Sequence, residues 1–186
     1  MADREELVAD CIELQQAVFQ KLSEKLEALD EFADKIIRVA YCCELVNKDL
    51  DELYYKRHFN FCPTQVGIPP NPENTIPLKV CLYVDKLPVA YALGDINDAR
   101  KAFEIHFMET SNFFGNTGLK GFIKYVFMIL LSLRDVLKET FQIDMDSIVQ
   151  VSPAQNSVSA FTEMGFDYIH DYGGTNNSAV VFKLNG

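Results

Sequence analysis

Two side chains that can accept a proton, Glu104 and His106, stand two positions apart in the segment 102–109. Apolar side chains alternate with the others in this segment, which predicts a strand with two different faces. One face carries Glu104, His106 and Met108, and the other carries Phe103, Ile105 and Phe107. A positioned imidazole or carboxylate can take a proton from an attacking amine. A histidine side chain, with an ordinary pKa of about 6.5, suits this role directly, whereas a glutamate at about 4.3 must first be buried.

Other side chains are alternative candidates for a site. Glu109 or Glu163 can supply the base instead, and the first pair can equally face solvent without a chemical role. Tyr168, His170 and Tyr172 alternate in the same way along a predicted strand over residues 167–172. They either line a pocket for an acceptor or form an ordinary half-exposed face.

A glycine-rich loop precedes the longest apolar helix that the sequence predicts, over about 119–141. The loop reads Phe114-Gly115-Asn116-Thr117-Gly118-Leu119-Lys120-Gly121. A helix N-terminus presents free N–H donors and a positive dipole end, and glycines let a phosphate approach closely. Gly115, Gly118, Lys120 and Gly121 are therefore candidate phosphate-binding residues. A plain turn that begins the helix is the alternative.

A strand–turn–helix pattern follows in residues 146–166. The apolar strand 148–151 ends in Ser152-Pro153-Ala154-Gln155-Asn156, a short helix carries Phe161, and Gly165 ends this helix directly before Phe166. A glycine at this place is a common helix terminator.

These patterns resemble the core of the GCN5-related N-acetyltransferase (GNAT) family. From residue 78 the predicted order is β-β-β-α-β-α-β-β, which is similar to the order of that core. The resemblance covers about residues 78–186, and the N-terminal helices stand for the first two helices of the family. It implies an α+β (α/β) fold with a mostly antiparallel mixed sheet flanked by helices.

The resemblance also implies a function. The expected activity is an acyl-CoA-dependent N-acyltransferase that acts on an amine by direct transfer, with acetyl-CoA as cofactor and no metal. The cofactor-binding residues would be Gly115, Gly118, Lys120, Gly121, Asn156 and Phe161. Glu104 and His106 would supply the catalytic base, because bases in this family often come from the third core strand.

The chain departs from the family pattern at two places. Lys120 replaces the second glycine of the phosphate loop, and Gly115 stands where glutamine or arginine is usual. Phe161 occupies the position of the tyrosine that protonates the departing thiolate in many members. The alternative reading is therefore a catalytically degenerate GNAT-fold interaction or structural protein. Small bacteriophage-encoded acetyltransferase-like proteins have similar departures, so the chain also resembles these.

The N-terminal part carries apolar side chains every three or four residues, through 7–29 and again through 32–53. This spacing predicts a helical hairpin in residues 4–57, with Asp30 as the cap of its second helix, or else one long helix. We divide the chain into this hairpin (1–60), packed on the core, a proline-rich loop (61–77) and the acyltransferase-like core (78–186), together one domain. The loop either covers a site or is a simple connector.

The net charge of −10 disfavours nucleic acid as a partner, because a negative field repels phosphates. It suits an amine-bearing small molecule or protein, and the acidic N-terminal helices suit a protein partner or a homo-oligomer. Solubility alone is the plainer explanation. Five cysteines without a preceding signal peptide predict a reduced, cytoplasmic chain. The longest apolar run, 125–133, is far shorter than the roughly 20 residues of a membrane span.

Overall fold

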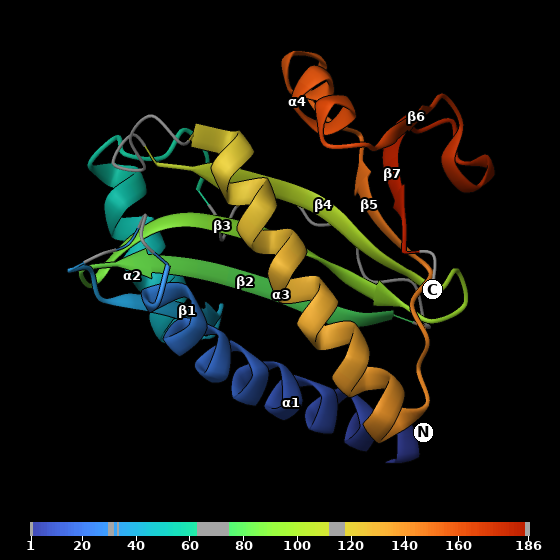
Figure 1. Cartoon of the computed structure of the whole chain (residues 1–186), viewed down its shortest axis with the longest axis horizontal. Helices are drawn as coiled ribbons and strands as arrows, with labels where there is room; N and C mark the ends of the chain where they lie inside the picture. Colours follow the sequence, from blue (N-terminus) through green and yellow to red (C-terminus); the bar gives the residue numbers. More distant parts are fainter. Residues whose placement is uncertain (1, 30–31, 33, 63–74, 112–117, 185–186) are drawn as a thin grey trace.

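The computed structural model describes residues 2–29, 32, 34–62, 75–111 and 118–184, without the side chains of residues 2, 3 and 118–120. Within these residues the strands form one seven-stranded sheet in the order β1-β2-β3-β4-β5-β7-β6 (Figure 1). The strands are β1 (Ile37–Tyr41), β2 (Thr75–Val84), β3 (Leu87–Asn97), β4 (Ala102–Thr110), β5 (Ser147–Val151), β6 (Asp167–Ile169) and β7 (Ala179–Lys183). The helices are α1 (Ala2–Glu27), α2 (Glu44–Tyr55), α3 (Gly118–Phe141) and α4 (Val158–Glu163), with 3-10 turns η3 (Gln155–Ser157) and η4 (Tyr172–Gly174).

The element order predicted for residues 78–186 is confirmed. The strands β2 to β4, the helix α3, the strand β5, the helix α4 and the strands β6 and β7 follow one another as expected. The sheet is antiparallel except for the pair β4–β5, which is parallel. A tight turn joins β2 to β3, where Asp85 and Lys86 have φ of 49° and 71°. Two successive positive φ angles are typical of the two-residue turn that joins twisted strands.

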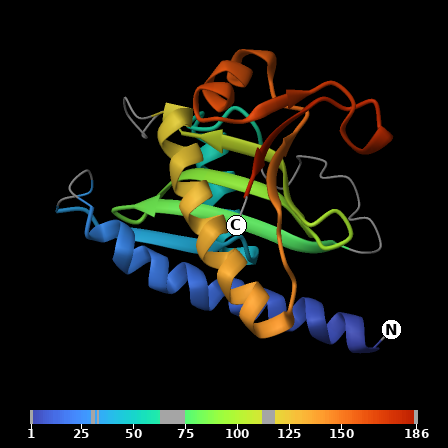
Figure 2. The same cartoon turned by 45° about the vertical axis from the view of Figure 1, so that its right-hand side comes forward.

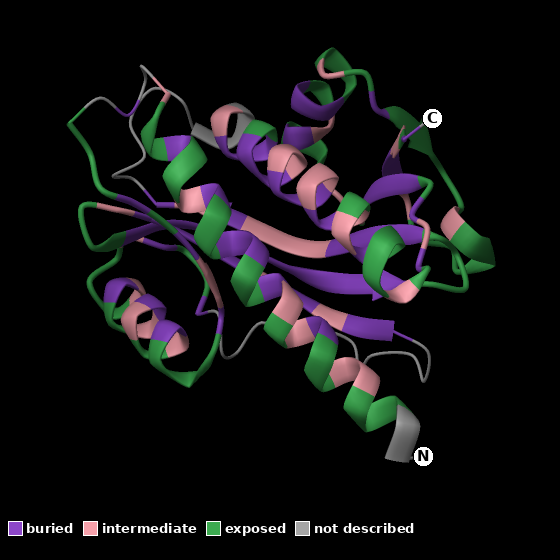
Figure 3. Ribbon diagram, turned by 60° about the horizontal axis from the view of Figure 1, so that its bottom comes forward, coloured by how far each residue is buried: buried purple, intermediate pink, exposed green. Residues whose placement is uncertain are grey.

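Helices cover both faces of the sheet. The main apolar core lies between the sheet and the helices α1, α3 and α4, and contains Phe19, Leu26, Phe103 and Leu130 among others. A second core lies on the opposite face, where α2 contributes Val46, Leu50 and Leu53. Figure 2 shows α1 and α3 side by side across one face. Figure 3 shows buried and exposed residues alternating along α1, as expected for a helix with one apolar stripe.

The predicted N-terminal helical hairpin is wrong in its second half. Residues 32–53 do not form one helix: the strand β1 and the separate helix α2 lie there instead. The segment 36–41 reads Ile-Ile-Arg-Val-Ala-Tyr, and its β-branched residues favour a strand. Phe32, Ile36 and Ala40 recur every four residues, so their spacing alone favoured a helix with these side chains buried on one face. In the structure, Ile36 is instead 59% exposed.

The strand β1 forms an edge of the sheet, and α1 covers that edge. Ser23 Oγ accepts a hydrogen bond from the N–H of Val39 at 2.9 Å, and Glu27 Oε1 accepts one from Ile37 at 2.9 Å. These two N–H groups lie on the side of β1 away from β2, where they would otherwise be free to pair with another chain. The segment 37–41 thus belongs to the same sheet as β2.

A bulge in β4 changes the predicted faces of that strand. Leu93 pairs with Phe107 and Gly94 with Ile105, so His106 is the extra residue. Beyond the bulge Phe107 packs in the core under α2, while Met108 packs in the core under α3. The prediction that Phe107 shares a face with Ile105 is therefore wrong, as is the placement of Met108 beside Glu104.

Two further boundaries differ from the predictions. The strand predicted over 167–172 ends at Ile169, so Tyr172 lies in the turn η4. The strand β2 begins at Thr75, so the predicted loop 61–77 ends earlier than expected. Pro77 is compatible with this strand, because a proline can stand in a strand where no N–H donor is needed. Residues 63–74 of that loop and the predicted cap Asp30 lie outside the described residues. None of the described helices is both long and apolar enough to cross a membrane.

Candidate functional site

The sheet opens between β4 and β5. The two strands pair only from Ala102 to Ile105 and from Ser147 to Gln150, whereas β4 continues to Thr110. Beyond the last pair the strands diverge, and the upper ends of α3 and α4 flank the gap (Figures 1 and 2). The unpaired ends of both strands present backbone groups to whatever lies in this opening. The candidate site is built around it.

His106 pairs with a buried aspartate on the neighbouring strand. Its Nε2 lies 3.0 Å from Oδ2 of Asp95 on β3, and the His106 side chain is 18% exposed while that of Asp95 is 1% exposed. A carboxylate at Nε2 fixes the ring and, with the proton on that nitrogen, leaves Nδ1 with a free lone pair. No contact of Nδ1 is found with the described residues. The pair therefore combines an imidazole held by a carboxylate with a second ring nitrogen that can accept a proton.

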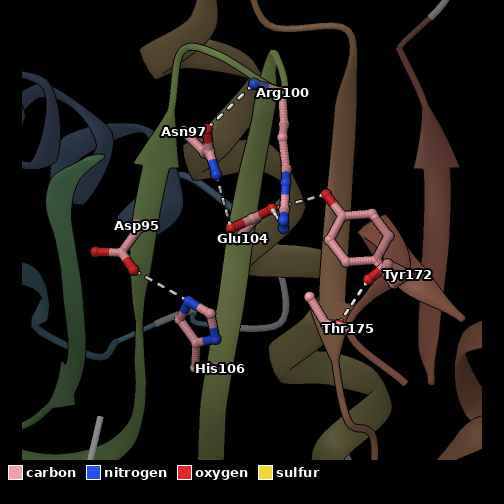
Figure 4. Close-up of polar contacts among 7 residues, drawn as sticks. All are labelled: Asp95, Asn97, Arg100, Glu104, His106, Tyr172 and Thr175. Carbon is pink, nitrogen blue, oxygen red and sulfur yellow. Dashed lines mark hydrogen bonds and ion pairs between the residues drawn. The ribbon is translucent and has the colours of Figure 1, made fainter. Parts of the chain in front are cut away.

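Glu104, the other predicted base, is fully engaged in hydrogen bonds (Figure 4). Its Oε1 accepts from Arg100 Nη1 at 3.1 Å and from the hydroxyl of Tyr172 at 2.8 Å, and its Oε2 accepts from Asn97 Nδ2 at 3.1 Å. The side chain is buried, and its negative charge is matched by Arg100. Glu104 links β4 to the turn η4, which is 68 residues away in the sequence. This arrangement suits a structural link between β4 and the C-terminal strands.

Glu109, an alternative base from the sequence, is also engaged. Its carboxylate accepts from the N–H groups of Asn60 and Phe61 at 2.6 and 3.3 Å, and from Asn60 Nδ2 at 2.9 Å. The hydroxyl of Tyr91 donates to its Oε2 at 3.0 Å. Burial, with the nearby Glu109 charge, raises the pKa of Tyr91. The group holds the segment that follows α2 against the centre of the sheet.

The buried tyrosines predict a loss of stability in alkali. Burial raises the pKa of Tyr83 and Tyr91 above the ordinary value of about 10, so above pH 10 the unfolded chain loses protons that the folded chain keeps. The free energy of unfolding should then fall by up to about 1.4 kcal/mol per pH unit for each such tyrosine. Urea titrations between pH 8 and pH 11 measure this slope. Tyr91→Phe should reduce the slope, whereas Tyr55→Phe, at a 73% exposed position, should not; equal slopes in both would contradict the prediction.

On the α3 side the opening between β4 and β5 is largely filled by apolar side chains. A cavity of about 10 Å³ remains, lined by Ile105, Met108, Ile123, Val126, Phe127, Ile148, Gln150, Phe161 and Phe166. Phe161 is 2% exposed and packs edge-on against Phe166, with ring centroids 5.3 Å apart. Gln150 has one buried oxygen, Oε1, without a hydrogen-bond partner among the described residues. Gln150 is also the one polar residue in the lining of this cavity.

The predicted cofactor-binding residues fall into three groups. Gly115 lies outside the described residues, and of Gly118 and Lys120 the structure describes only the backbone at the start of α3. Gly121 is partly exposed in the first turn of α3, which contains no acidic residue. Asn156 is exposed in the turn η3, whereas Phe161 is in the apolar cluster. The structure thus brings Phe161 to the strand opening, but does not bring Asn156 into contact with it.

The sequence interpretation missed Asp95, Asn97 and Arg100. Asp95 and Asn97 stand two and four residues beyond Leu93 and continue the alternation of β3. Following that alternation to Asn97 would have placed Asp95 opposite the 102–109 segment. The sequence predicts Tyr172 on a strand face, either lining an acceptor pocket or half-exposed, and no sequence signal indicates its bond to Glu104.

A metal centre is not evident in the part of the chain that the structure describes. There, no group of three or more His, Cys, Asp or Glu side chains is arranged to hold an ion. The five cysteines are free thiols, and Cys43 alone among them is exposed. Burial, and secondarily Asp10, raises the pKa of Cys11 to about 11. The other four thiols are buried, and that of Cys62 donates a hydrogen bond to Asp51 Oδ1 at 3.1 Å.

No protein-family model and no curated protein sequence matches the chain. Solved structures do match. The GNAT domain of S. lividans PAT aligns with 80% of this chain and 90% of its own, at a TM-score of 0.51 and 11% identity. An uncharacterized protein from Bacillus halodurans aligns with 84% of this chain and 88% of its own, at a TM-score of 0.51 and 14% identity. The ribosomal-protein-S18-alanine N-acetyltransferase from Escherichia coli aligns with 81% of this chain and 95% of its own, at a TM-score of 0.45 and 10% identity.

The likenesses at a TM-score of 0.51 show the fold: the chain has a GNAT-like α+β fold, as the sequence resemblance implied. At such low identities they show the fold alone, because one fold can carry many functions. The matches give no support to the bacteriophage resemblance.

Proposed function

We propose that this chain is an acyl-CoA-dependent N-acyltransferase, with acetyl-CoA as the donor, that transfers an acyl group directly to an amine. The observation that carries the proposal is the pair His106–Asp95 at the bulge of β4, next to the place where β4 and β5 diverge. A base held at a strand opening meets the requirement for removing a proton from an acceptor nitrogen. The GNAT-like fold supports the same reading.

His106 is the base in this proposal. The acceptor enters as a neutral amine, its nitrogen forms the new amide bond, and it loses one proton, which His106 Nδ1 takes. Asp95 holds the imidazole through Nε2 at 3.0 Å and stabilises the imidazolium that forms. Glu104 has no comparable freedom, because three donors occupy its two oxygens. Its role is to position β4 relative to η4.

The described residues could hold some of the groups of acyl-CoA, the acyl donor. A bound acyl-CoA would supply the acyl group as a thioester, and its sulfur would leave as a thiolate that takes a proton from solvent. The unpaired ends of β4 and β5 and the orphan Gln150 Oε1 would hold its amide-bearing arm, and the first turn of α3 would hold its phosphates. The cavity of about 10 Å³ is smaller than such an arm, so Met108 and Phe161 must move on binding. The proton donor that the family places on this helix has no counterpart, because Phe161 carries no hydroxyl.

Acetyl-CoA binding tests the proposal. We expect saturable binding by calorimetry, weakened about tenfold or more by Gly121→Asp, because a carboxylate in the first turn of α3 repels the phosphates across a short distance. Gly121→Ala is the matched control: it adds a Cβ without charge and should retain the affinity. Both variants should stay folded, since alanine favours helix and an acidic residue suits a helix N-terminus.

An absence of binding at millimolar acetyl-CoA would overturn the proposal. It would favour the alternative, a GNAT-fold interaction or structural protein, with the filled cavity as its explanation. Equal affinities for the two Gly121 variants would instead place the phosphates away from α3.

A further inference from the structure

We propose that the groove between α1 and α3 binds a second copy of this chain, with the two α1 helices packed antiparallel. The inference concerns a surface on the outside of the helices, away from the strand opening. It does not depend on the proposed function.

The groove lies where α1 and α3 run side by side across one face of the sheet (Figure 2). It has a volume of about 310 Å³, and apolar side chains from both helices line it, namely Leu14, Val18, Leu22 and Val136. Of these, Leu14 and Val136 remain partly exposed. A helix laid into such a groove buries apolar surface of its own and of the two helices beside it.

The charges of α1 are divided between its two ends. Lys21 and Lys25 are exposed and line the groove one turn apart, whereas Glu6 and Asp10 are exposed in the N-terminal half. None of the four has an ion-pair partner within the part of the chain that the structure describes. The lining also contains the carboxylate of Asp135, so the lysines exceed it by one charge. A groove with this excess favours an acidic helix as its occupant.

The two halves of α1 complement each other when two copies pack antiparallel. Asp10, Leu14, Ala17 and Lys21 are spaced by three or four residues, so they share one side of the helix. In a two-fold antiparallel pair, Asp10 lies opposite Lys21 of the second copy and Leu14 lies opposite Ala17, and each contact occurs twice. A parallel pair would place Asp10 against Asp10 and Lys21 against Lys21, so like charges disfavour it.

The contact is smaller than that of a permanent dimer. The helix α1 has 26 residues and is about 39 Å long, and one side of it takes part. Contacts of this size are typical of weak association. We therefore expect monomer and dimer to be in equilibrium at micromolar concentrations. Added salt should shift this equilibrium toward the monomer, because it screens exposed charge pairs.

A charge exchange tests the pairing in the full chain by sedimentation equilibrium. Lys21→Glu and Asp10→Lys each place like charges opposite one another, so either variant alone should dimerise about tenfold more weakly or worse. An equimolar mixture of the two variants should dimerise again. In the mixed pair the new carboxylate of one copy faces the new ammonium of the other, and the unchanged Asp10 faces the unchanged Lys21.

Lys48→Glu is the matched control, because it makes the same change of charge at an exposed position of α2, on the opposite face of the sheet. It should leave the association unchanged, and thermal melts check that every variant stays folded. A native chain that remains monomeric up to millimolar concentration would overturn the inference. Undiminished dimerisation of Lys21→Glu, or a mixture of the two variants that stays monomeric, would overturn it as well.

Discussion

Replacing His106 by glutamine is expected to lower the rate constant of acyl transfer by about 100- to 10,000-fold, the usual contribution of a positioned general base. Glutamine can still donate an amide N–H to Asp95, so the variant should keep the local structure while losing the proton acceptor. Single-turnover transfer from acetyl-CoA to n-butylamine measures the effect. Acetyl-CoA binding, measured separately, should change little, because His106 is not among the residues that hold the donor.

The control for this variant is His170→Gln. His170 is exposed and makes an edge contact with the ring of Tyr168, away from the strand opening. Its replacement should leave the rate within about twofold of the original, since surface changes of this kind are usually small. A His106→Gln enzyme with unaltered single-turnover rate would show that another group removes the proton.

The largest expected effect on stability is that of Gly94→Ala. A Cβ at position 94 would overlap the backbone oxygen of Glu104 and lie 2.9 Å from Cα of Ile105. Neither atom is at the end of a flexible side chain, so β3 and β4 would have to separate at the bulge. We expect the free energy of unfolding to fall by about 3 kcal/mol, as for severe overpacking. Equilibrium unfolding in urea measures it.

Gly174→Ala is the matched control, because it isolates the conformational cost from the steric one. Gly174 has a φ of +70°, and a Cβ there meets no atom within 4 Å. The expected cost is about 1–2 kcal/mol, that of placing an L residue in the left-handed region. If Gly94→Ala lowers the free energy of unfolding by no more than Gly174→Ala does, the close approach of the β3 and β4 backbones at Gly94 does not set the register of β4.

Local patterns were sufficient to predict the core of the fold. The alternation in residues 78–110, the apolar periodicity of 119–141 and the break at Gly165 each depend on a few neighbouring residues. Their order led to the GNAT resemblance and to a fold class that the solved structures confirm. The same local patterns also selected His106 and Glu104 as candidate bases.

Local patterns failed where distant segments decide the structure. The strand β1 exists because β2 offers it a partner more than thirty residues away, and because Ser23 and Glu27 of α1 cover its free edge. A helical spacing in the same residues gave the wrong prediction, since strand propensity depends on the neighbours that a segment finds.

The sequence by itself determined the order of the elements and the chemical types available at the centre of the sheet. Only the tertiary structure decided which of those side chains are free to react. The bulge at His106 and the pairing of β3 with β4 bring Asp95 to its ring. The fold of the C-terminal strands brings Tyr172 to Glu104 and occupies that carboxylate. The physical reason is that hydrogen-bond partners of buried groups come from any part of the chain, whereas sequence patterns report only the nearest residues.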